Sequence, residues 1–515
     1  MGAAQKAYEG VEFDHVVVGA GSAGCVVARR LVDAGRRVLL VETGGRDDDP
    51  AIHDPGSLGK LWNSPSDYAY FTEPQAHADG TKVFWPRGRV LGGSSAINAM
   101  IYVRGHRADY DDWAASGATG WSYDEVLPYF KRSEDFEDGA SYYHGASGPL
   151  TVSRNHRPNP VSSAFVEACV DSGLPLNDDC NAEDTLGAGL LHRTIRDGRR
   201  NTAWVAFLAP VLGNPLLTVR TDCRADRIVF DDEGTARGVE LEAHGERTTV
   251  RCSGDVILSG GTIGSAQLLL LSGIGPADEL RALGIPVRAD LPGVGQNLHD
   301  HTIAPMVWES PSLIPDGREN KLEAQYFARS DAAQPVPDLQ PLMSHMPLPV
   351  AGYEVPVAGY GWTVLAGHVR PLSRGAVRLR SADPADTPVL DPNYLADPAD
   401  LAALIAGIRL TREIVATKAL ADWRSVEIAP GPGVRSDAEI TAYVRRTLQS
   451  YHHQVGTCRM GTDPDAVVDP VLRVHGVPGL RVADASVMPS VPSGNTNAPS
   501  IMVGERCADF VRQAG

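Results

Sequence analysis

The sequence lacks the cysteine patterns that build zinc sites or secreted disulfide frameworks. Its seven cysteines are scattered over 515 residues, none forms a CxxC pair, and their number is odd. The chain has no run of about 18 apolar residues, so we expect no membrane span. Its first residues, MGAAQKAYEGVEF, have no basic-then-apolar signal pattern. We therefore expect a cytoplasmic protein without a metal site.

Basic residues are in the minority, which disfavours one class of partner. The chain has 47 Lys and Arg against 64 Asp and Glu, a formal net charge of -17. Because an acidic surface repels phosphate backbones, we do not expect nucleic acid to bind. The hydrophobic share of 43% is enough for a large core, and the length predicts two domains or one domain with large insertions. Nothing in the sequence predicts an oligomeric state.

The N-terminal stretch DHVVVGAGSAGCVVARRLVDAGRRVLLVE has the order of a dinucleotide-binding unit. A β-branched run is followed by GxGxxG, an apolar-faced helix and a second strand. Gly19 permits the tight turn, Gly21 lets the backbone approach a pyrophosphate, and Gly24 lets the helix pack against the strand. Glu42, which ends the second strand, can accept hydrogen bonds from ribose hydroxyls. This acid disfavours NADP and leaves NAD and FAD.

Two further glycine-rich stretches favour FAD over NAD. They are WPRGRVLGGSSAINAMIYVRG (residues 85–105) and GTIGSAQLLLLSGIGP (residues 261–276). The second follows a short predicted strand and reads as a helix that ends at a glycine. Such loops bring backbone amides close to a large flat ligand. Both stretches in this order are therefore typical of an FAD protein.

These stretches resemble the glucose–methanol–choline (GMC) oxidoreductases, a family of FAD-dependent alcohol oxidases and dehydrogenases. The resemblance runs from about Asp14 to about Asp509, and within the family it points to the choline dehydrogenase and the furfuryl and aryl alcohol oxidase branch. It rests on the fingerprint above and on GRVLGGSSAIN, GTIGSAQLLLLSGIGP, PGVGQNLHDH, DPNYLADPAD, HHQVGTCRMG and LRVADASVMPSVPSGNTNAPSIMVGERCAD.

The resemblance implies two intertwined domains. A Rossmann-like α/β domain for FAD would comprise residues 1–155, 195–305 and 450–515. An α+β substrate domain with an antiparallel sheet would comprise residues 156–194 and 306–449. The second region contains alternating runs such as GAVRLRS, which predict strands, and DLAALIAGIRLTREIVA, whose 3.6-residue period predicts an amphipathic helix.

The resemblance also implies which residues hold FAD. The pyrophosphate would lie at the fingerprint loop, the adenosine ribose at Glu42, the adenine near the backbone of Ala225, and the flavin against the second loop and the C-terminal segment. The implied cofactor residues are Gly19, Gly21, Ser22, Ala23, Gly24, Glu42, Val90, Asn98, Ile101, Ala225, His452, Asp484, Ala485, Thr496 and Asn497.

The adjacent histidines of SYHHQVGTCRMG are unequal by the same resemblance. The family motif H-x-x-G-T fits His453, which we expect to be the catalytic base, and places His452 beside the flavin. Asn495, in PSGNTNAP, falls at the position of the family's second catalytic residue. Alcohol oxidation delivers a hydride to flavin N5, and a base of near-neutral pKa must take the hydroxyl proton. An amide can position that hydroxyl without changing charge.

Two positions depart from the pattern of choline oxidases. Ile97 stands where some of them attach FAD covalently through a histidine, so we expect non-covalent FAD. Ile303 stands where they hold the substrate cation with a glutamate, and a buried cation without a counter-charge is costly. We therefore expect a primary, neutral, apolar or aromatic alcohol that is oxidised to its aldehyde. Trp362 and His345 could reach the substrate, although packing is the commoner role for such side chains.

Other activities stay open at this stage. Some GMC relatives are hydroxynitrile lyases with an idle flavin, and a choline or sugar alcohol dehydrogenase with a non-oxygen acceptor would carry the same motifs. A light-driven fatty-acid decarboxylase of the family lacks the catalytic histidine, so His453 argues against that activity. A NAD-dependent dehydrogenase would contain no flavin. The sequence does not decide whether oxygen or another acceptor reoxidises the flavin.

Overall fold

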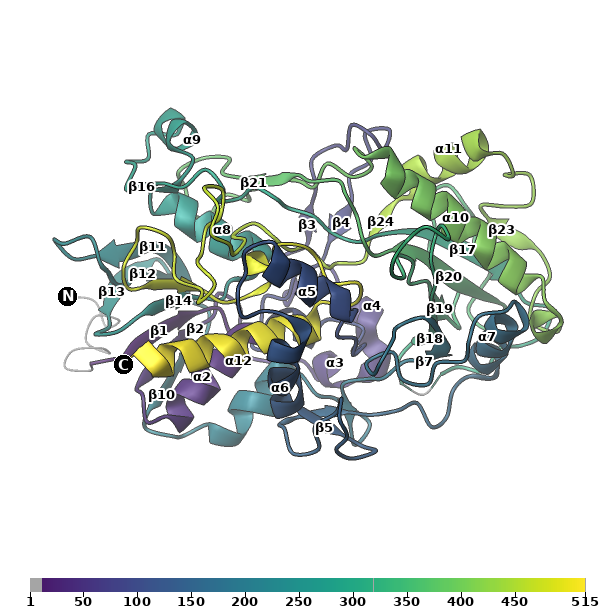
Figure 1. Cartoon of the computed structure of the whole chain (residues 1–515), viewed down its shortest axis with the longest axis horizontal. Helices are drawn as coiled ribbons and strands as arrows, with labels where there is room; N and C mark the ends of the chain where they lie inside the picture. Colours follow the sequence, from purple (N-terminus) through teal and green to yellow (C-terminus); the bar gives the residue numbers. More distant parts are fainter. Residues whose placement is uncertain (1–11, 318, 515) are drawn as a thin grey trace.

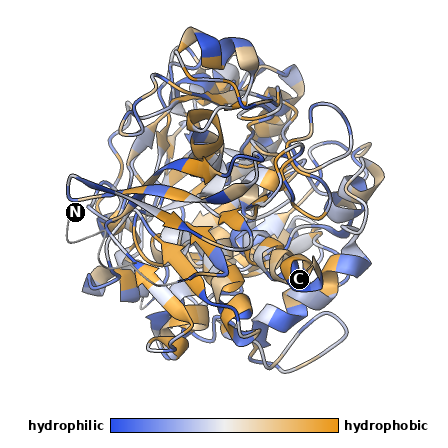
Figure 2. Ribbon diagram, turned by 90° about the vertical axis from the view of Figure 1, so that its left-hand side faces the viewer, coloured by the Kyte–Doolittle hydropathy of each residue, from blue (hydrophilic) through white to orange (hydrophobic). Residues whose placement is uncertain are grey.

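A five-stranded parallel sheet forms one half of the molecule (Figure 1). The computed structural model describes residues 12–514 apart from residue 318, so most of the N-terminal segment judged to lack a signal lies outside the described residues. The strand order is β10 (Leu217–Arg220), β2 (Val38–Val41), β1 (His15–Val18), β14 (Val256–Leu258) and β25 (Leu480–Val482). Figure 2, which looks onto this half, shows its strands as largely hydrophobic. Continuous apolar runs suit a sheet that is buried on both faces.

Three long helices follow the strands of this sheet or pack on it. They are α2 (Ser22–Asp33), α8 (Gly261–Leu271) and α12 (Asn497–Ala514). Residues 15–41 therefore form the predicted strand, glycine loop, helix and second strand. The helix α2 begins after Gly21 without a side-chain cap, so its first amides remain available to a ligand.

Buried charges join α12 to its neighbours. The Glu505 side chain is fully buried and lies 2.7 Å from a nitrogen of Arg30 on α2 and 2.7 Å from a nitrogen of Arg132 on α6 (Tyr123–Ser133). In addition, Ser22 donates a hydrogen bond of 2.7 Å to Asn497. Segments from the two ends of the chain are thus fixed together beside the parallel sheet, as Figure 1 shows.

The other half contains a seven-stranded antiparallel sheet. Its order is β23 (Glu427–Ala429), β17 (Thr302–Glu309), β20 (Gly361–His368), β19 (Leu342–Ser344), β18 (Leu322–Phe327) and β7 (Gly187–Leu190), and β24 (Gln449–Ser450) also pairs with β17. The helices α7 (Pro160–Asp171), α10 (Pro398–Val415) and α11 (Asp437–Thr447) lie on the outside of this half in Figure 1. The predicted Rossmann-like half and antiparallel-sheet half are both confirmed.

Smaller elements complete the fold. The antiparallel sheet of β11 (Arg224–Phe230), β12 (Ala236–Ala243) and β13 (Glu246–Arg251) flanks the parallel sheet. Short pairs are β3 (Tyr70–Phe71) with β4 (Phe84–Trp85), β5 (Glu134–Phe136) with β6 (Leu150–Val152), β8 (Ile195–Arg196) with β9 (Arg199–Arg200), β15 (Ile274–Gly275) with β16 (Ala289–Asp290), and β21 (Ala376–Arg378) with β22 (Val389–Asp391). Short helices are α3 (Pro50–His53), α4 (Leu58–Leu61), α5 (Arg107–Ala115) and α9 (Ala277–Ala282).

Three expectations can be compared with these elements. The amphipathic helix is α10, as predicted. The GAVRLRS run forms β21, which pairs antiparallel with β22 and stays outside the seven-stranded sheet. The strand β17 runs from Thr302 to Glu309 and β24 from Gln449 to Ser450, so each strand spans one of the predicted domain borders, at 305 and 449. No helix among the described residues is long and apolar enough to cross a membrane.

Candidate active site

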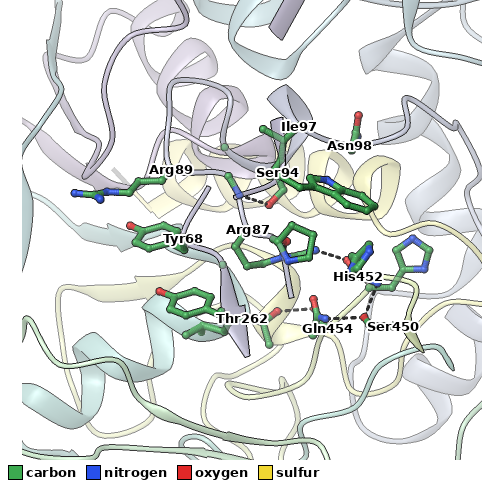
Figure 3. A pocket seen from close by; sticks show the side chains of 18 of the residues that line it. Tyr68, Arg87, Arg89, Ser94, Ile97, Asn98, Thr262, Ser450, His452 and Gln454 are labelled. Atoms are coloured by element: carbon green, nitrogen blue, oxygen red, sulfur yellow. Dashed lines mark hydrogen bonds between the residues drawn. The ribbon is translucent and has the colours of Figure 1, made fainter. Parts of the chain in front are cut away.

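A large cavity of about 1100 Å³ lies between the two halves. The loops after β1, β2 and β14 reach it from the parallel sheet, which is the usual edge for ligands in such sheets. The strands β17, β18, β19 and β20 reach it from the antiparallel sheet. Figure 3 shows part of the wall, with Tyr68, Arg87, Thr262 and His452 around this space. The cavity is therefore the candidate active site.

The fingerprint glycines form one end of the cavity. Gly19, Gly21, Ser22 and Ala23 line it. A Cβ atom on Gly21 would meet only the Cα of Gly93, at 3.9 Å, so the backbone is open to a ligand there. Gly24 does not line the cavity, and a Cβ on it would lie 1.9 Å from the Gly19 carbonyl oxygen. Its role is the close helix–strand packing that the fingerprint predicts.

Glu42 faces the cavity with both carboxylate oxygens already held. One oxygen accepts from the Ala20 amide at 3.0 Å and the other from the Gly44 amide at 2.8 Å. Burial raises the pKa of this carboxyl to about 7. Since each oxygen keeps a free lone pair, the group can accept hydrogen bonds from ribose hydroxyls. Ala225, at the start of β11, lines the same end.

The second glycine-rich loop supplies another wall. Asn98 and Ile101 line the cavity, and Ile97 does so as well. The buried Arg200 donates a hydrogen bond of 3.0 Å to the Asn98 side chain and fixes its orientation. Val90 does not line the cavity; it is buried in a small apolar cluster with Ile97. The predicted contact of Val90 with the flavin is therefore not seen at the cavity wall.

The C-terminal segment closes the cavity near the start of α12. Asp484, Ala485, Thr496 and Asn497 all line it. One oxygen of Asp484 accepts from the Gly261 amide at 2.9 Å and from the Ser265 hydroxyl at 2.6 Å. These bonds hold the second βα loop of the sheet against the C-terminal segment. The uncapped amides of α2, the ribose acceptor and the glycine-lined backbone together fit the pyrophosphate, sugar and flat ring of FAD.

His453 is held on every side by polar contacts. Its amide donates to Asp300 at 2.7 Å, its Nδ1 lies 3.0 Å from Nδ1 of His301, and its Nε2 lies 3.0 Å from the Asn495 side-chain nitrogen. Its ring stacks on Tyr451 with 5.2 Å between centroids. The structure thus brings the two predicted catalytic residues together at the cavity.

The contacts of His452 differ from those of His453. Its backbone has a φ of +67°, an uncommon value for a residue other than glycine. The ring packs edge-on against Trp62 at 5.2 Å, and the carbonyl oxygen accepts from Arg87 at 2.6 Å. Figure 3 shows Arg87 and His452 side by side at the cavity. His452 is therefore part of the cavity wall, whereas His453 contacts Asn495.

Electrostatics keep the His453 imidazole neutral. Burial lowers its pKa well below the ordinary value, and the neighbouring His452 and Arg87 lower it further. Burial also lowers the pKa of His452, to about 3. An uncharged imidazole is the form that can accept a proton. His453 therefore needs no prior deprotonation at neutral pH, but its lowered pKa differs from the near-neutral value that we expected of the base.

The part of the cavity next to His453 is apolar. Ile303 from β17, Leu322 from β18, Leu342 from β19 and Leu365 from β20 line it together with Tyr451. The acids among the described lining residues are Glu42, Asp386 and Asp484, and none of them comes from the antiparallel sheet. The wall beside the base thus carries no carboxylate.

Two suggested substrate contacts are not in the cavity wall. Trp362 is buried, stacks on Trp308 with centroids 4.9 Å apart, and donates to the Trp423 carbonyl oxygen at 2.8 Å. His345 is buried next to Glu323, although its neighbours in the chain line the cavity. Both residues have packing roles, which was the commoner expectation for them.

The sequence did not single out three residues around the base: Asp300, His301 and Tyr451. Asp300 and His301 belong to the motif NLHDH, where an acid between two histidines immediately precedes a buried strand. That pattern was the available signal for them. Tyr451 offered no signal, because a tyrosine before the histidine pair is as compatible with packing as with a site. All three contact His453 directly.

Comparison with known proteins identifies the family. The chain matches GMC oxidoreductase over residues 13–303 and again over residues 371–504. It is 44% identical to the mitochondrial choline dehydrogenase of Homo sapiens over 97% of this chain and 90% of that protein. It is 40% identical to the alcohol dehydrogenase [acceptor] of Pseudomonas putida over 97% of this chain and 95% of that protein.

A solved structure gives the same result. Pyridoxine 4-oxidase from Mesorbium loti superimposes with a TM-score of 0.93 at 35% identity, over 98% of this chain and 99% of that chain. The superposed 98% of this chain includes both sheets. The chain belongs to the GMC oxidoreductase family and is an FAD-dependent alcohol oxidoreductase.

Proposed function

We propose that this enzyme oxidises a primary, neutral, apolar or aromatic alcohol to its aldehyde, with His453 as the base and Asn495 as its partner. The observation that carries the proposal is the 3.0 Å approach of Asn495 Nδ2 to His453 Nε2 at an otherwise apolar end of the cavity. Ile303, Leu365 and Tyr451 exclude water there and favour an apolar substrate body.

The proton chemistry follows from this pair. A substrate hydroxyl that enters between the two side chains donates its proton to His453 Nε2 and accepts a hydrogen bond from Asn495 Nδ2. His301 holds the other ring nitrogen, and Asp300 holds the backbone, so the imidazole does not need to reorient. FAD, when bound, supplies the two-electron chemistry by accepting the hydride from the carbinol carbon.

A second candidate substrate is choline, favoured by the name of the human relative. The cavity argues against it, since the wall next to His453 carries no carboxylate to pair with a trimethylammonium group. Lining aromatic side chains such as Trp62 and Tyr451 offer a trimethylammonium group cation–π contacts but no counter-charge. We therefore place choline below apolar and benzylic alcohols.

FAD is held without a covalent bond in this proposal. Ile97, which faces the cavity, has no nucleophilic atom. Cys223 also lines the cavity, but burial raises the pKa of its thiol, and a protonated thiol is a poor nucleophile.

The test compares alcohols and histidine variants in one experiment. A panel of benzylic, aliphatic and sugar alcohols and choline is assayed for peroxide and for dye reduction, which also identifies the electron acceptor. We expect benzylic or aliphatic alcohols to give the highest kcat/KM. His453→Ala should retain flavin and lose roughly a hundred- to ten-thousandfold in kcat, while His452→Ala should lose far less. Flavin that stays oxidised on anaerobic mixing with every alcohol would indicate a lyase and overturn the proposal.

A further inference from the structure

A chain of buried amides lies behind the catalytic pair, outside the cavity wall. Gln340, which is fully buried, places its Nε2 atom 2.9 Å from Oε1 of Gln325 and 3.2 Å from Oδ1 of Asn495. Gln325 lies on β18 and continues the chain with a contact of 3.2 Å to the Cys180 sulfur. The Gln340 backbone is fixed as well, because its carbonyl oxygen accepts from the Tyr451 hydroxyl.

The order of donors and acceptors along this chain has a chemical consequence. Both hydrogens of Gln340 Nε2 are used, one for each acceptor oxygen. Since Asn495 Oδ1 is occupied as an acceptor, the Asn495 amide must present Nδ2, a donor, to His453 Nε2. If Asn495 turned over alone, two NH₂ groups would face each other at Gln340. Reversal would require Gln325, Gln340 and Asn495 to turn together.

The orientation of Asn495 in turn selects the tautomer of His453. A donor opposite Nε2 requires that nitrogen to carry its lone pair, so neutral His453 carries its hydrogen on Nδ1. That hydrogen is donated to His301 Nδ1, 3.0 Å away. In the opposite orientation, Asn495 Oδ1 would favour hydrogen on Nε2, which could not take a substrate proton.

We propose that Gln340 is a positioning residue of the reaction, which acts through Asn495 to hold His453 in the tautomer whose Nε2 lone pair faces the cavity. The inference rests on the proposed roles of His453 and Asn495. Gln340 itself does not line the cavity and touches no substrate. Its effect must therefore appear in turnover and disappear when Asn495 is absent.

The first measurement uses Gln340→Leu, which keeps similar volume and removes both hydrogens. We expect kcat to fall about tenfold, the equivalent of one buried hydrogen bond, with KM and flavin content within about twofold of the wild type. Gln340→Met serves if the leucine variant folds poorly, with thermal unfolding and flavin absorbance as checks on both. A kcat within twofold of the wild type in a folded variant would overturn the proposal.

The second measurement is a double-mutant cycle with Asn495→Ala. If Gln340 acts through Asn495, adding Gln340→Leu to Asn495→Ala should change the rate less than twofold, whereas a general packing role would give the same loss in both backgrounds. Anaerobic single-turnover bleaching of the flavin resolves the slow variants. Equal losses in both backgrounds would overturn the proposal.

A matched control is another buried glutamine outside the cavity. Gln75 accepts from the Tyr394 amide and donates to the Glu73 carbonyl oxygen, so Gln75→Leu should behave the same in both backgrounds. A wild type that oxidises no alcohol would count against the proposed function. An active wild type, an impaired His453→Ala and additive losses at Gln340 would count against Gln340 alone.

Discussion

Ile97 gives the clearest residue-scale prediction about the cofactor. Its branched hydrocarbon side chain faces the cavity at the position where the resemblance places a covalent histidine in some choline oxidases. Acid precipitation of the purified enzyme should leave the flavin in the supernatant, because Ile97 has no nucleophilic atom and burial keeps the lining thiol of Cys223 protonated. Absorbance of pellet and supernatant measures the partition. Flavin that remains with the precipitated protein would refute non-covalent binding, and free FAD added to a non-flavin protein is the control for carry-over.

Single residues show what the sequence could and could not predict about the site. His453, Asn495 and Glu42 stand in local motifs, and the structure places each at the cavity. Asp300 and Gln340 contact the catalytic pair, His453 and Asn495, only in the folded chain, since they precede His453 by more than a hundred residues. Their contacts depend on how the two sheets meet, which no local pattern encodes.

At the scale of elements, the helix α12 depends on one buried carboxylate. Replacing Glu505 with Gln leaves Arg30 and Arg132 without their common counter-charge. Because these arginines remain partly exposed, we expect a loss of about 2 kcal/mol in the free energy of unfolding, below the range for fully buried pairs. Thermal and urea unfolding measure the change.

A neighbouring carboxylate provides the control for that prediction. Asp509 lies on the same helix and contacts Arg132 at 3.0 Å, but its side chain is 19% exposed. Asp509→Asn should therefore cost less than about 1 kcal/mol, as expected for a pair open to water. Equal losses in the two variants would show that burial of Glu505 does not set its contribution.

Helices and strands were predicted best where the apolar pattern repeats over many residues. The helix α10 spans 18 residues, and its repeating apolar positions indicated it without ambiguity. The strand β21 was also recognised, but alternation does not choose a partner strand, and β21 pairs with β22 in a separate two-stranded sheet. Partner choice in the seven-stranded sheet joins segments from residue 187 to residue 450, beyond the reach of a local reading.

The whole molecule should lose stability on acidification. Burial lowers the pKa of many histidines in the fold, namely His15, His192, His299, His301, His345, His368, His452 and His453. The unfolded chain binds protons at these sites below about pH 6.5 and the folded chain does not, so their contribution is complete above that pH and is lost as the pH falls. Buried carboxyls with raised pKa, such as Glu42 at about 7, oppose the trend but are fewer.

The size of the expected stability loss follows from the linkage between proton binding and unfolding. Each such histidine removes up to about 1.4 kcal/mol per pH unit once the pH is well below 6.5. The melting temperature should therefore fall steadily from pH 7 to pH 5 at constant ionic strength, with and without added FAD. A melting temperature that stays constant or rises over this range would contradict the prediction. His144, whose pKa is raised through its bonds to Asp179 and Glu134, works in the opposite direction.

The pairing of β17 with β24 has a consequence for engineering. The bridge between Thr302 and Ser450 fixes the short segments that carry His301 and His453, so these segments form one rigid unit. Ser344, Met346 and Leu348 line the same cavity from β19 and from the loop after it, outside these two segments. Libraries that vary those three positions can alter which alcohols enter while leaving the proton-accepting unit untouched.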